Sequence, residues 1–321
     1  MAAILVYSEQ ADTALELVGA ARGLAPQLGL TVSAAVLGAE AAGTAAAAAA
    51  LAAHGAAPVY VCTEPALEGL DTAVVTQALA HIVEQAGASV VLLGSTRRGR
   101  ELGGRLAQRL GAGCVTDAIS LTVEDGLLVA GRYNLGGATV QRETIATPVQ
   151  VVAVMPKIFE AGEPGGAGAG EAVVAVSAEL AAPAVKVVDR RPKEGQAVDL
   201  AAAARIVGVG RGLAKRDDLP LTEALAAALG AKLACTKSLA DFGWMADDRI
   251  VGLSGAKTAP DMYLAVGISG QVQHTVGIAQ ARIIAVVNQD KDAPMFALAD
   301  YGVVGDLYKL VPALVERLKT L

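Results

Sequence analysis

Residues 206–212, Ile-Val-Gly-Val-Gly-Arg-Gly, form a short apolar run that ends in three glycines and an arginine. Such a run is typical of a buried parallel strand followed by a tight turn, and open α/β sheets bind ligands at these strand ends. Arg211 could hold a phosphate there. An ordinary tight turn explains the glycines equally well. The spacing does not fit G-x-G-x-x-G, because Leu213 stands three residues after Gly210, so the usual NAD fingerprint is absent.

Two further apolar runs in this half also lead into glycine. Residues 251–255 read Val-Gly-Leu-Ser-Gly, and residues 266–274 read Val-Gly-Ile-Ser-Gly-Gln-Val-Gln-His. In the second run, Ser269 suits the N-cap of a helix expected over residues 270–279, and Gly270 adds no bulky side chain. Free N–H groups and the dipole at a helix start favour negative charge. We therefore expect an anion site that suits a pyrophosphate or a reduced flavin ring.

His274 would lie one turn into that helix, on the face of Gly270. A surface or core histidine is the ordinary interpretation, but the glycine context favours contact with a ligand. Other single residues have ordinary explanations. His54 and His81 are expected to be structural histidines, and Cys235 is expected to be a small buried hydrophobe. Arg97, Arg98 and Arg100 are expected in a solvated turn or in a contact with another protein chain, whereas Phe242 and Trp244 could cover a ring ligand or anchor a loop.

The rest of the second half alternates strands and helices. Strands are expected over 205–209, 232–235, 249–252, 262–266 and 282–287, and helices over 219–229, 270–279, 293–299 and 305–319. This order predicts a doubly wound, Rossmann-like domain.

The first half begins with the same alternation and then changes to β-rich sequence. Strands are expected over 3–7, 32–37, 59–62 and 89–93, and then over 119–123, 127–133, 138–143 and 149–155. Asp125-Gly126 and Gly136-Gly137 are hairpin signals. The fold class is therefore α/β, with two Rossmann-like domains, the first a parallel sheet with an antiparallel extension.

Two stretches interrupt the chain between these halves. Residues 162–170 are rich in glycine and predict a surface loop, and residues 189–195 are charged and poor in apolar side chains. We expect an N-terminal domain over 1–190, a linker over 191–204 and a C-terminal domain over 205–321.

Composition excludes several classes of protein. The 321 residues are 54% hydrophobic and 18% charged, which excludes disorder, and the net charge of −6 argues against a nucleic-acid partner. A mean hydropathy of +0.48 comes largely from alanine, without a run of 18 strongly apolar residues, so no membrane insertion is expected. Three widely spaced cysteines and a start without a basic leader favour a reducing cytoplasm, and no metal site is expected.

Residues 260–274, which contain the run Val-Gly-Ile-Ser-Gly-Gln-Val-Gln-His, resemble the signature of the electron transfer flavoprotein α subunit. The resemblance continues through residues 288–296 and 299–307, is strongest over 208–312, and includes residues 94–117 of the first half. It implies a subunit that pairs with a β subunit and carries one FAD, mainly in the C-terminal domain. The family passes electrons from flavin dehydrogenases, such as acyl-CoA dehydrogenases, to a quinone oxidoreductase. This implies an electron carrier without catalytic side chains of its own.

The resemblance also implies roles for single residues. Arg211 would lie beside the FAD phosphates and Ser254 near flavin N5, with His274 facing the ring O2. The flavin and its phosphate linker would be lined by Ser269, Gly270, Gln273 and His274, the adenosine end would be held by Asn288 and Asp306, and further contacts would come from Thr236, Lys237, Gly252, Leu253, Gln271 and Leu307.

Two positions depart from the family pattern. Thr236-Lys237 stands where the family usually has Ser-Arg, and Leu253 stands where it usually has Gln. Lysine keeps the positive charge but lacks the planar guanidinium that stacks over a ring. The departure bears directly on how strongly this chain stabilises anionic flavin.

Three alternatives remain at this point. An electron-bifurcating complex that oxidises NADH would carry a second flavin in the β subunit, so this chain alone does not distinguish it. An NAD-dependent oxidoreductase is disfavoured by the missing fingerprint. A non-redox scaffold that binds adenine nucleotides is disfavoured by the presence of Ser254, His274 and Asn288.

Overall fold

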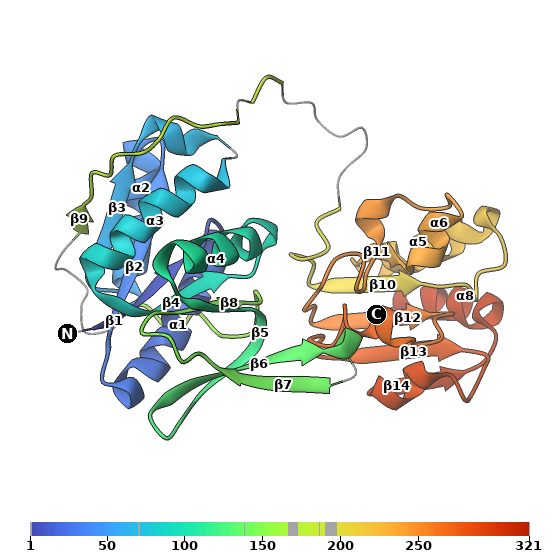
Figure 1. Ribbon diagram of the computed structural model, residues 1–321. Coiled ribbons are helices and arrows are strands. Elements are labelled where there is room, and N and C mark those ends of the chain that lie inside the picture. Colours follow the sequence, from blue (N-terminus) through green and yellow to red (C-terminus); the bar gives the residue numbers. More distant parts are fainter. Residues whose placement is uncertain are drawn as a thin grey trace. The chain divides into compact units, whose positions relative to one another are not determined.

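The computed structural model describes residues 2–69, 71–137, 139–165, 173–185, 187–189 and 198–320. These residues form two compact units (Figure 1). The first unit contains residues 1–133 and 140–190, and the second contains residues 134–139 and 191–321. Each unit is described separately.

The first unit is built on a nine-stranded sheet with the order β7-β6-β5-β8-β4-β1-β2-β3-β9. The strands are β1 (Ala3–Tyr7), β2 (Thr31–Gly38), β3 (Val59–Thr63), β4 (Ala88–Gly94), β5 (Gly113–Glu124), β6 (Leu127–Asn134), β7 (Thr139–Thr144), β8 (Gln150–Val154) and β9 (Val173–Ala175). The helices are α1 (Ala11–Leu28), α2 (Ala41–Ala53), α3 (Thr72–Ala86) and α4 (Arg97–Leu110), with the 3-10 turn η1 (Pro65–Glu68). The 3-10 turn η2 (Leu135–Gly137), which follows β6, belongs to the second unit.

Helices cover both faces of this sheet. One apolar core includes Leu17 of α1 and Leu51 of α2, and a second includes Leu79 of α3 and Leu102 of α4. β4 carries the apolar run Val90–Leu93, which is buried as expected for a strand covered on both faces. β4 is parallel to β1 and β8, and β5 is parallel to β8 but antiparallel to β6. The predicted parallel sheet with an antiparallel extension is confirmed.

The second unit is built on a five-stranded parallel sheet with the order β11-β10-β12-β13-β14. The strands are β10 (Arg205–Val209), β11 (Lys232–Cys235), β12 (Met262–Val266), β13 (Ile284–Asn288) and β14 (Tyr301–Val304). The helices are α5 (Leu219–Ala228), α6 (Lys237–Asp241), α7 (Val272–Thr275) and α8 (Leu307–Leu318), with 3-10 turns η3 (Arg216–Asp218), η4 (Asp247–Arg249) and η5 (Pro294–Leu298).

The topology of this sheet fixes where a ligand site can form. The chain passes from β10 to β11 on one side, and β12 then returns to the other side of β10. The strand order therefore reverses between β10 and β12, and open α/β sheets have their ligand crevice at such a reversal. Leu225 of α5 and Val311 of α8 pack on one face, whereas Leu200, Ile278 and Met295 pack on the other. The predicted Rossmann-like architecture is confirmed.

Several predicted elements differ in detail. Residues 249–252, predicted as a strand, form only single bridges, Cys235 with Ile250 and Val251 with Ala256. The helix predicted over 270–279 is the single turn α7, because Gly277 packs against the backbone of Gly252 and the chain turns there. The helix predicted over 293–299 is the 3-10 turn η5. β9 and the short edge strand β14, exposed along its whole length, were not predicted.

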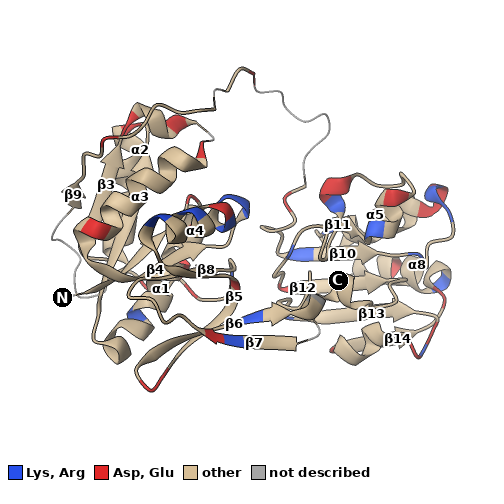
Figure 2. Ribbon diagram, in the orientation of Figure 1, with Lys and Arg blue, Asp and Glu red and all other residues tan. Residues whose placement is uncertain are grey.

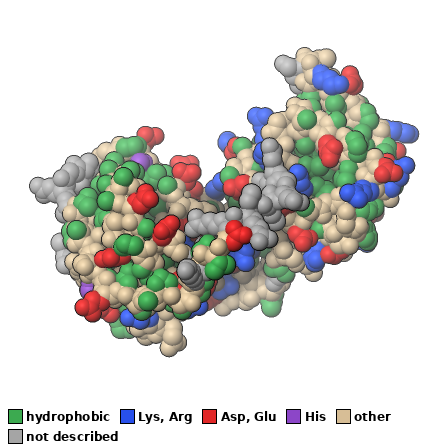
Figure 3. Space-filling model, turned by 90° about the horizontal axis from the view of Figure 1, so that it is seen from above, with side chains coloured by type: hydrophobic (Ala, Val, Ile, Leu, Met, Phe, Trp, Pro, Cys, Tyr) green, Lys and Arg blue, Asp and Glu red, His purple; other side chains and the backbone are tan. Residues whose placement is uncertain are grey.

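Residues 97–100, predicted as a solvated turn or a contact with another chain, begin helix α4. Thr96 caps this helix by accepting a hydrogen bond from the Gly99 N–H at 2.9 Å. Arg98 donates to the Gly69 carbonyl at 2.9 Å, and Arg100 lies 3.4 Å from the Asp117 carboxylate. The basic residues of α4 are blue on the ribbon in Figure 2. Elsewhere, acidic and basic side chains are interspersed on the visible faces (Figure 3).

Among the helices of the described segments, none has the length and apolar character needed to cross a bilayer.

Two glycines of α4 give a matched test of this packing. A Cβ on Gly99 would clash with the Gly94 carbonyl oxygen at the end of β4, whereas a Cβ on Gly104 meets no atom within 4 Å. We expect Gly99→Ala to lower the free energy of unfolding by about 3 kcal/mol through overpacking. Gly104→Ala should raise it by about 0.5 to 1 kcal/mol, because alanine restricts the unfolded chain. Urea titrations followed by circular dichroism measure both; equal effects would contradict the contact.

Candidate functional site

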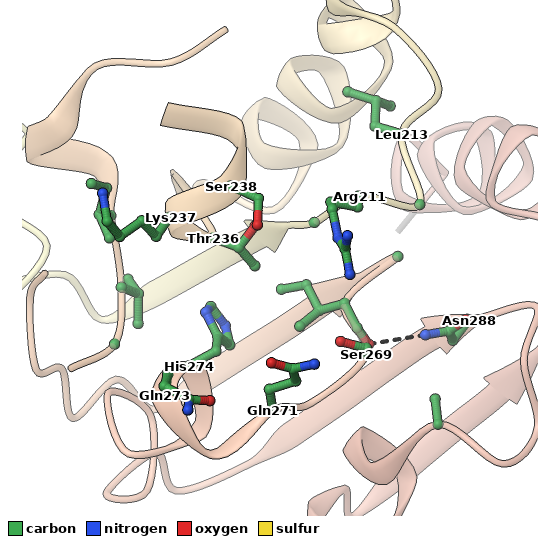
Figure 4. Close-up of a pocket in the computed structure, with 18 of the residues that line it drawn as sticks. Arg211, Leu213, Thr236, Lys237, Ser238, Ser269, Gln271, Gln273, His274 and Asn288 are labelled. Atoms are coloured by element: carbon green, nitrogen blue, oxygen red, sulfur yellow. Dashed lines mark hydrogen bonds between the residues drawn. The ribbon is translucent and has the colours of Figure 1, made fainter. Parts of the chain in front are cut away.

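A cavity of about 750 Å³ lies in the second unit, at the carboxyl ends of the parallel strands. The turns that follow β10, β11 and β12 all contribute to its lining, as does the last residue of β13 (Figure 4). The cavity lies where the strand order reverses, between β10 and β12. The sheet therefore brings together, from four strand ends, segments that are far apart in the sequence.

Two glycine turns pack backbone to backbone beside this cavity. A Cβ on Gly210 would lie 2.5 Å from the Gly267 carbonyl oxygen, and a Cβ on Gly212 would lie 2.5 Å from the Gly267 Cα. Gly267 also has φ of +62°, which side chains disfavour. These glycines therefore have a structural task, since they let the turns after β10 and β12 touch. Arg211, between two of them, is exposed and lines the cavity.

A third close contact joins the loop after residue 251 to the turn α7. Gly252 has φ of +134°, and a Cβ there would clash with the Gln273 carbonyl oxygen. The Leu253 N–H donates to that same oxygen at 2.7 Å. Ser254 follows on the cavity wall. The loop that carries Leu253 and Ser254 is thus held directly against the segment that carries His274.

The predicted helix-dipole site at residue 270 is wrong. Helix α7 has only four residues, and its N-cap is Gln271, without a side-chain cap bond, rather than Ser269. One turn of helix has too few aligned peptides to act as an anion site. Gly270, with φ of +88°, does not line the cavity; a Cβ there would clash with the Met295 N–H nitrogen. Close packing against η5 explains why position 270 is glycine.

Most of the predicted residues come together around the cavity. They are Arg211, Thr236, Lys237, Gly252, Leu253, Ser254, Ser269, Gln271, Gln273, His274 and Asn288. Asp306 and Leu307 instead line an adjoining cavity of about 320 Å³, which shares Gly212, Gly267 and Asn288 with the first. Asp306 caps α8 by accepting a hydrogen bond from the Tyr308 N–H at 2.9 Å.

Asn288 holds the turn after β12 in place. Its side-chain amide donates to the Ile268 carbonyl at 2.9 Å, drawn as the dashed line in Figure 4, and its Oδ1 accepts from the Asp290 N–H at 3.0 Å. The side chain therefore stabilises the cavity wall even without a ligand. Asp290, which also lines the cavity, was not predicted; its place just after a strand end was the available signal.

Two buried polar atoms on the wall have no hydrogen-bond partner within the described structure: Thr236 Oγ1 and His274 Nδ1. Both residues line the cavity. Leaving a buried donor or acceptor unpaired costs about 1 to 3 kcal/mol. Such groups are rare in folded proteins and call for an explanation. Because both residues line one cavity, a polar ligand bound there is a candidate for the missing partners.

Burial lowers the pKa of His274 to about 4, an effect that the nearby Val251 backbone carbonyl partly opposes. The imidazole is therefore neutral at pH 7, with one N–H and one free nitrogen. Its Nε2 lies 2.9 Å from the Tyr263 hydroxyl oxygen. His274 is thus a neutral hydrogen-bonding group in this site rather than a cation.

Lys237, which stands where arginine was expected from the family pattern, forms an ion pair within its own helix, α6. Its Nζ donates to Asp241 Oδ1 at 2.6 Å, and this hydrogen bond raises the pKa of Lys237. Both side chains are more than half exposed. The positive charge at this edge of the cavity is therefore largely balanced by Asp241.

Phe242 and Trp244 both line the cavity, with ring centroids 5.6 Å apart. Phe242 is 58% exposed. Cys235 is fully buried, and burial raises the pKa of its thiol to about 12, so it is a small core residue.

The state of His274 can be measured directly. In the ligand-free protein we expect its ring to stay neutral down to about pH 5 and to titrate near pH 4, because burial disfavours the charged form. The unfolded chain takes up this proton near pH 6.5, so the contribution to stability is complete above that pH and is lost as the pH falls to about 4. NMR of labelled histidine is practical because the chain has three histidines.

His274→Gln assigns the signal, and His81→Gln, at an exposed position of α3, is the control. A His274 ring that titrates near pH 6.5 would show that the side chain is not buried as described.

Two family models match this chain. Residues 4–181 match the "Electron transfer flavoprotein domain" and residues 199–279 match the "Electron transfer flavoprotein FAD-binding domain". YdiR of Escherichia coli K12 is 38% identical over 245 residues, covering 75% of this chain and 78% of that protein. FixB of E. coli O17:K52:H18 is 40% identical over 244 residues, covering 75% and 77%. The chain therefore belongs to the electron transfer flavoprotein α-subunit family, whose cofactor is FAD and whose members function with a β subunit and redox partners.

Proposed function

We propose that this chain binds FAD in the cavity of its second unit and, paired with a β subunit, carries electrons from flavin dehydrogenases, such as acyl-CoA dehydrogenases, to a quinone oxidoreductase. The observation that carries the proposal is the pair of unpartnered buried atoms, Thr236 Oγ1 and His274 Nδ1, on one cavity wall. That wall lies in the part of the chain that matches the family's FAD-binding domain. A cytoplasmic location, which the three free cysteines suit, belongs to the same proposal.

The size of the site suits a large, extended ligand. The main cavity, about 750 Å³, falls within the range of small-molecule sites. The adjoining cavity of about 320 Å³ shares part of its wall with it. A long two-part cofactor could occupy both, with its ring system against His274 and Thr236 and its other end toward Asp306.

The chemistry of the lining also suits FAD. A flavin ring has polar atoms along one edge and an apolar body, and the wall offers both kinds of surface. His274 Nδ1, Thr236 Oγ1 and the backbone can satisfy polar atoms, while Phe242 and Leu253 supply exposed apolar surface. Arg211, exposed beside the glycine turns, is the cation available to a phosphate group.

When bound, FAD supplies the electron-transfer chemistry, and the chain's residues bind it, orient it and exclude water from it. His274, neutral and buried, is suited to donate a hydrogen bond and not to exchange a proton at pH 7. Among the described residues, no group of three or more histidine, cysteine or carboxylate side chains could hold a metal ion. The role that we propose for the chain is that of an electron carrier, because bound FAD would supply the redox chemistry.

Flavin counting tests the proposal as a whole. We expect the complex with a β subunit, expressed with ample FAD, to be yellow and to contain one FAD per heterodimer. Two flavins per heterodimer would instead favour an electron-bifurcating complex with a second flavin in the partner. A colourless complex that does not retain added FAD would contradict the proposal.

A matched pair of threonines tests the carrying observation. Thr236→Val removes an unsatisfied buried hydroxyl, so it should leave the flavin-free protein equally or more stable, yet weaken FAD binding about tenfold. Thr222→Val removes a buried hydroxyl that donates to the Leu219 carbonyl at 2.9 Å within α5. It should lower stability by about 1 kcal/mol and leave FAD affinity unchanged.

Calorimetric titration with FAD and urea unfolding measure the two quantities. Unchanged FAD affinity in Thr236→Val would show that the hydroxyl does not face the cofactor.

A further inference from the structure

A second buried polar group lies directly behind His274. Tyr263, on β12, is 0% exposed, and its hydroxyl oxygen lies 2.9 Å from His274 Nε2. The two rings are tilted by 57° with their centroids 5.9 Å apart, so they meet through the hydroxyl and not by stacking. Tyr263 lies in the core with Ile206, Ala265 and Val286, where phenylalanine would fill nearly the same space. Packing alone does not explain the hydroxyl.

The neighbouring strand makes room for this hydroxyl. A Cβ on Gly208, the fourth of the five residues of β10, would overlap the Tyr263 hydroxyl oxygen. Glycine within a strand weakens it, by up to about 1 kcal/mol relative to alanine. The sheet therefore carries a local cost that serves to place one hydroxyl group beside His274. This also explains the first glycine of the run at 206–212, which the turn does not require.

The surroundings set the direction of the Tyr263–His274 hydrogen bond. Burial keeps both groups neutral, since it raises the pKa of Tyr263 and lowers that of His274. If Nε2 carried the hydrogen, the tyrosine hydrogen would need another acceptor, and no other bond of this hydroxyl is found in the described structure. If Tyr263 donates to Nε2, the hydrogen of the ring lies on Nδ1, the atom that has no hydrogen-bond partner in the described structure and belongs to a residue lining the cavity. The second arrangement leaves one unpartnered group, Nδ1–H, whereas the first leaves both the tyrosine hydrogen and Nδ1 without a partner.

We propose that Tyr263 is a positioning residue: its hydroxyl fixes the tautomer and the plane of His274, so that Nδ1–H is held toward the cavity as a permanent hydrogen-bond donor. This rests on the proposed function, in which that cavity holds FAD. A fixed neutral donor in a buried site stabilises a cofactor atom more as that atom gains negative charge. Tyr263 would thus tune the potential of the cofactor through His274, without touching it.

The tautomer can be read without any electron transfer. In the complex with labelled histidine, 15N NMR distinguishes the nitrogen that carries hydrogen from the one that accepts it, and His274→Gln assigns the signal. We expect Nδ1–H in the wild type, with or without FAD. In Tyr263→Phe we expect a mixture of tautomers. A wild-type complex that carries the hydrogen on Nε2 overturns the proposal, and this arm needs no variant to fold.

The potential of bound FAD gives the second readout. Tyr263→Phe should lower the preference for reduced over oxidised FAD about tenfold, which is about 30 mV for a two-electron couple. In the His274→Gln background the same substitution should produce no further shift, because its effect passes through the imidazole. Tyr7→Phe removes a phenol that is 5% exposed on β1 of the first unit, and should change neither the tautomer nor the potential.

The outcomes separate this proposal from the proposed function. If the wild-type complex binds FAD but Tyr263→Phe keeps the wild-type tautomer and potential, the positioning role is wrong and the proposed function stands. An equal shift of potential in the His274→Gln background has the same meaning. A wild-type complex that binds no FAD overturns both, whereas a redistributed tautomer in Tyr263→Phe with FAD bound supports both.

Discussion

The close contact between two glycine turns determines the geometry of this site. Gly210 and Gly212 after β10 meet Gly267 after β12, and none of these three positions has room for a side chain. Because these are the strands between which the chain order reverses, the contact lies at the base of the crevice that such sheets leave open. Asn288, bonded to Ile268, supports the same turn from the next strand. Arg211 and Ser269 lie at the cavity because these two turns carry them there.

The site relies on neutral groups more than on free charge. His274 is uncharged because it is buried, and the charge of Lys237 is balanced by Asp241. The unpartnered hydroxyl of Thr236 adds another neutral polar atom. A neutral donor that is already oriented needs no reorganisation when charge develops near it, whereas a mobile exposed cation is screened by water. The cavity would therefore stabilise a redox cofactor through oriented neutral groups more than through net charge.

Much of the fold was predictable, because parallel strands buried on both faces are continuous apolar runs with clear ends. The predicted bounds of β1, β10, β11 and β12 agree with the structure. The helix over 270–279 was not predictable in the same way, since nothing local shows that Gly277 must pack against Gly252. β14 was not predicted because its four residues, although mostly apolar, are too short a run to give a clear strand pattern. Most candidate site residues were found because they follow strand ends or carry the family resemblance.

Residue types and their order along the chain were enough to establish the α/β class, the family resemblance and the segments that reach the cavity. Tertiary structure alone decided which atoms are left without partners, since burial and hydrogen bonding depend on residues distant in sequence. Tyr263 shows the difference most clearly. In the sequence it is an aromatic residue of a buried strand; in the fold its hydroxyl meets His274 because Gly208, on the neighbouring strand, has no side chain. Contacts between strands far apart along the chain are set by packing, and no local pattern encodes them.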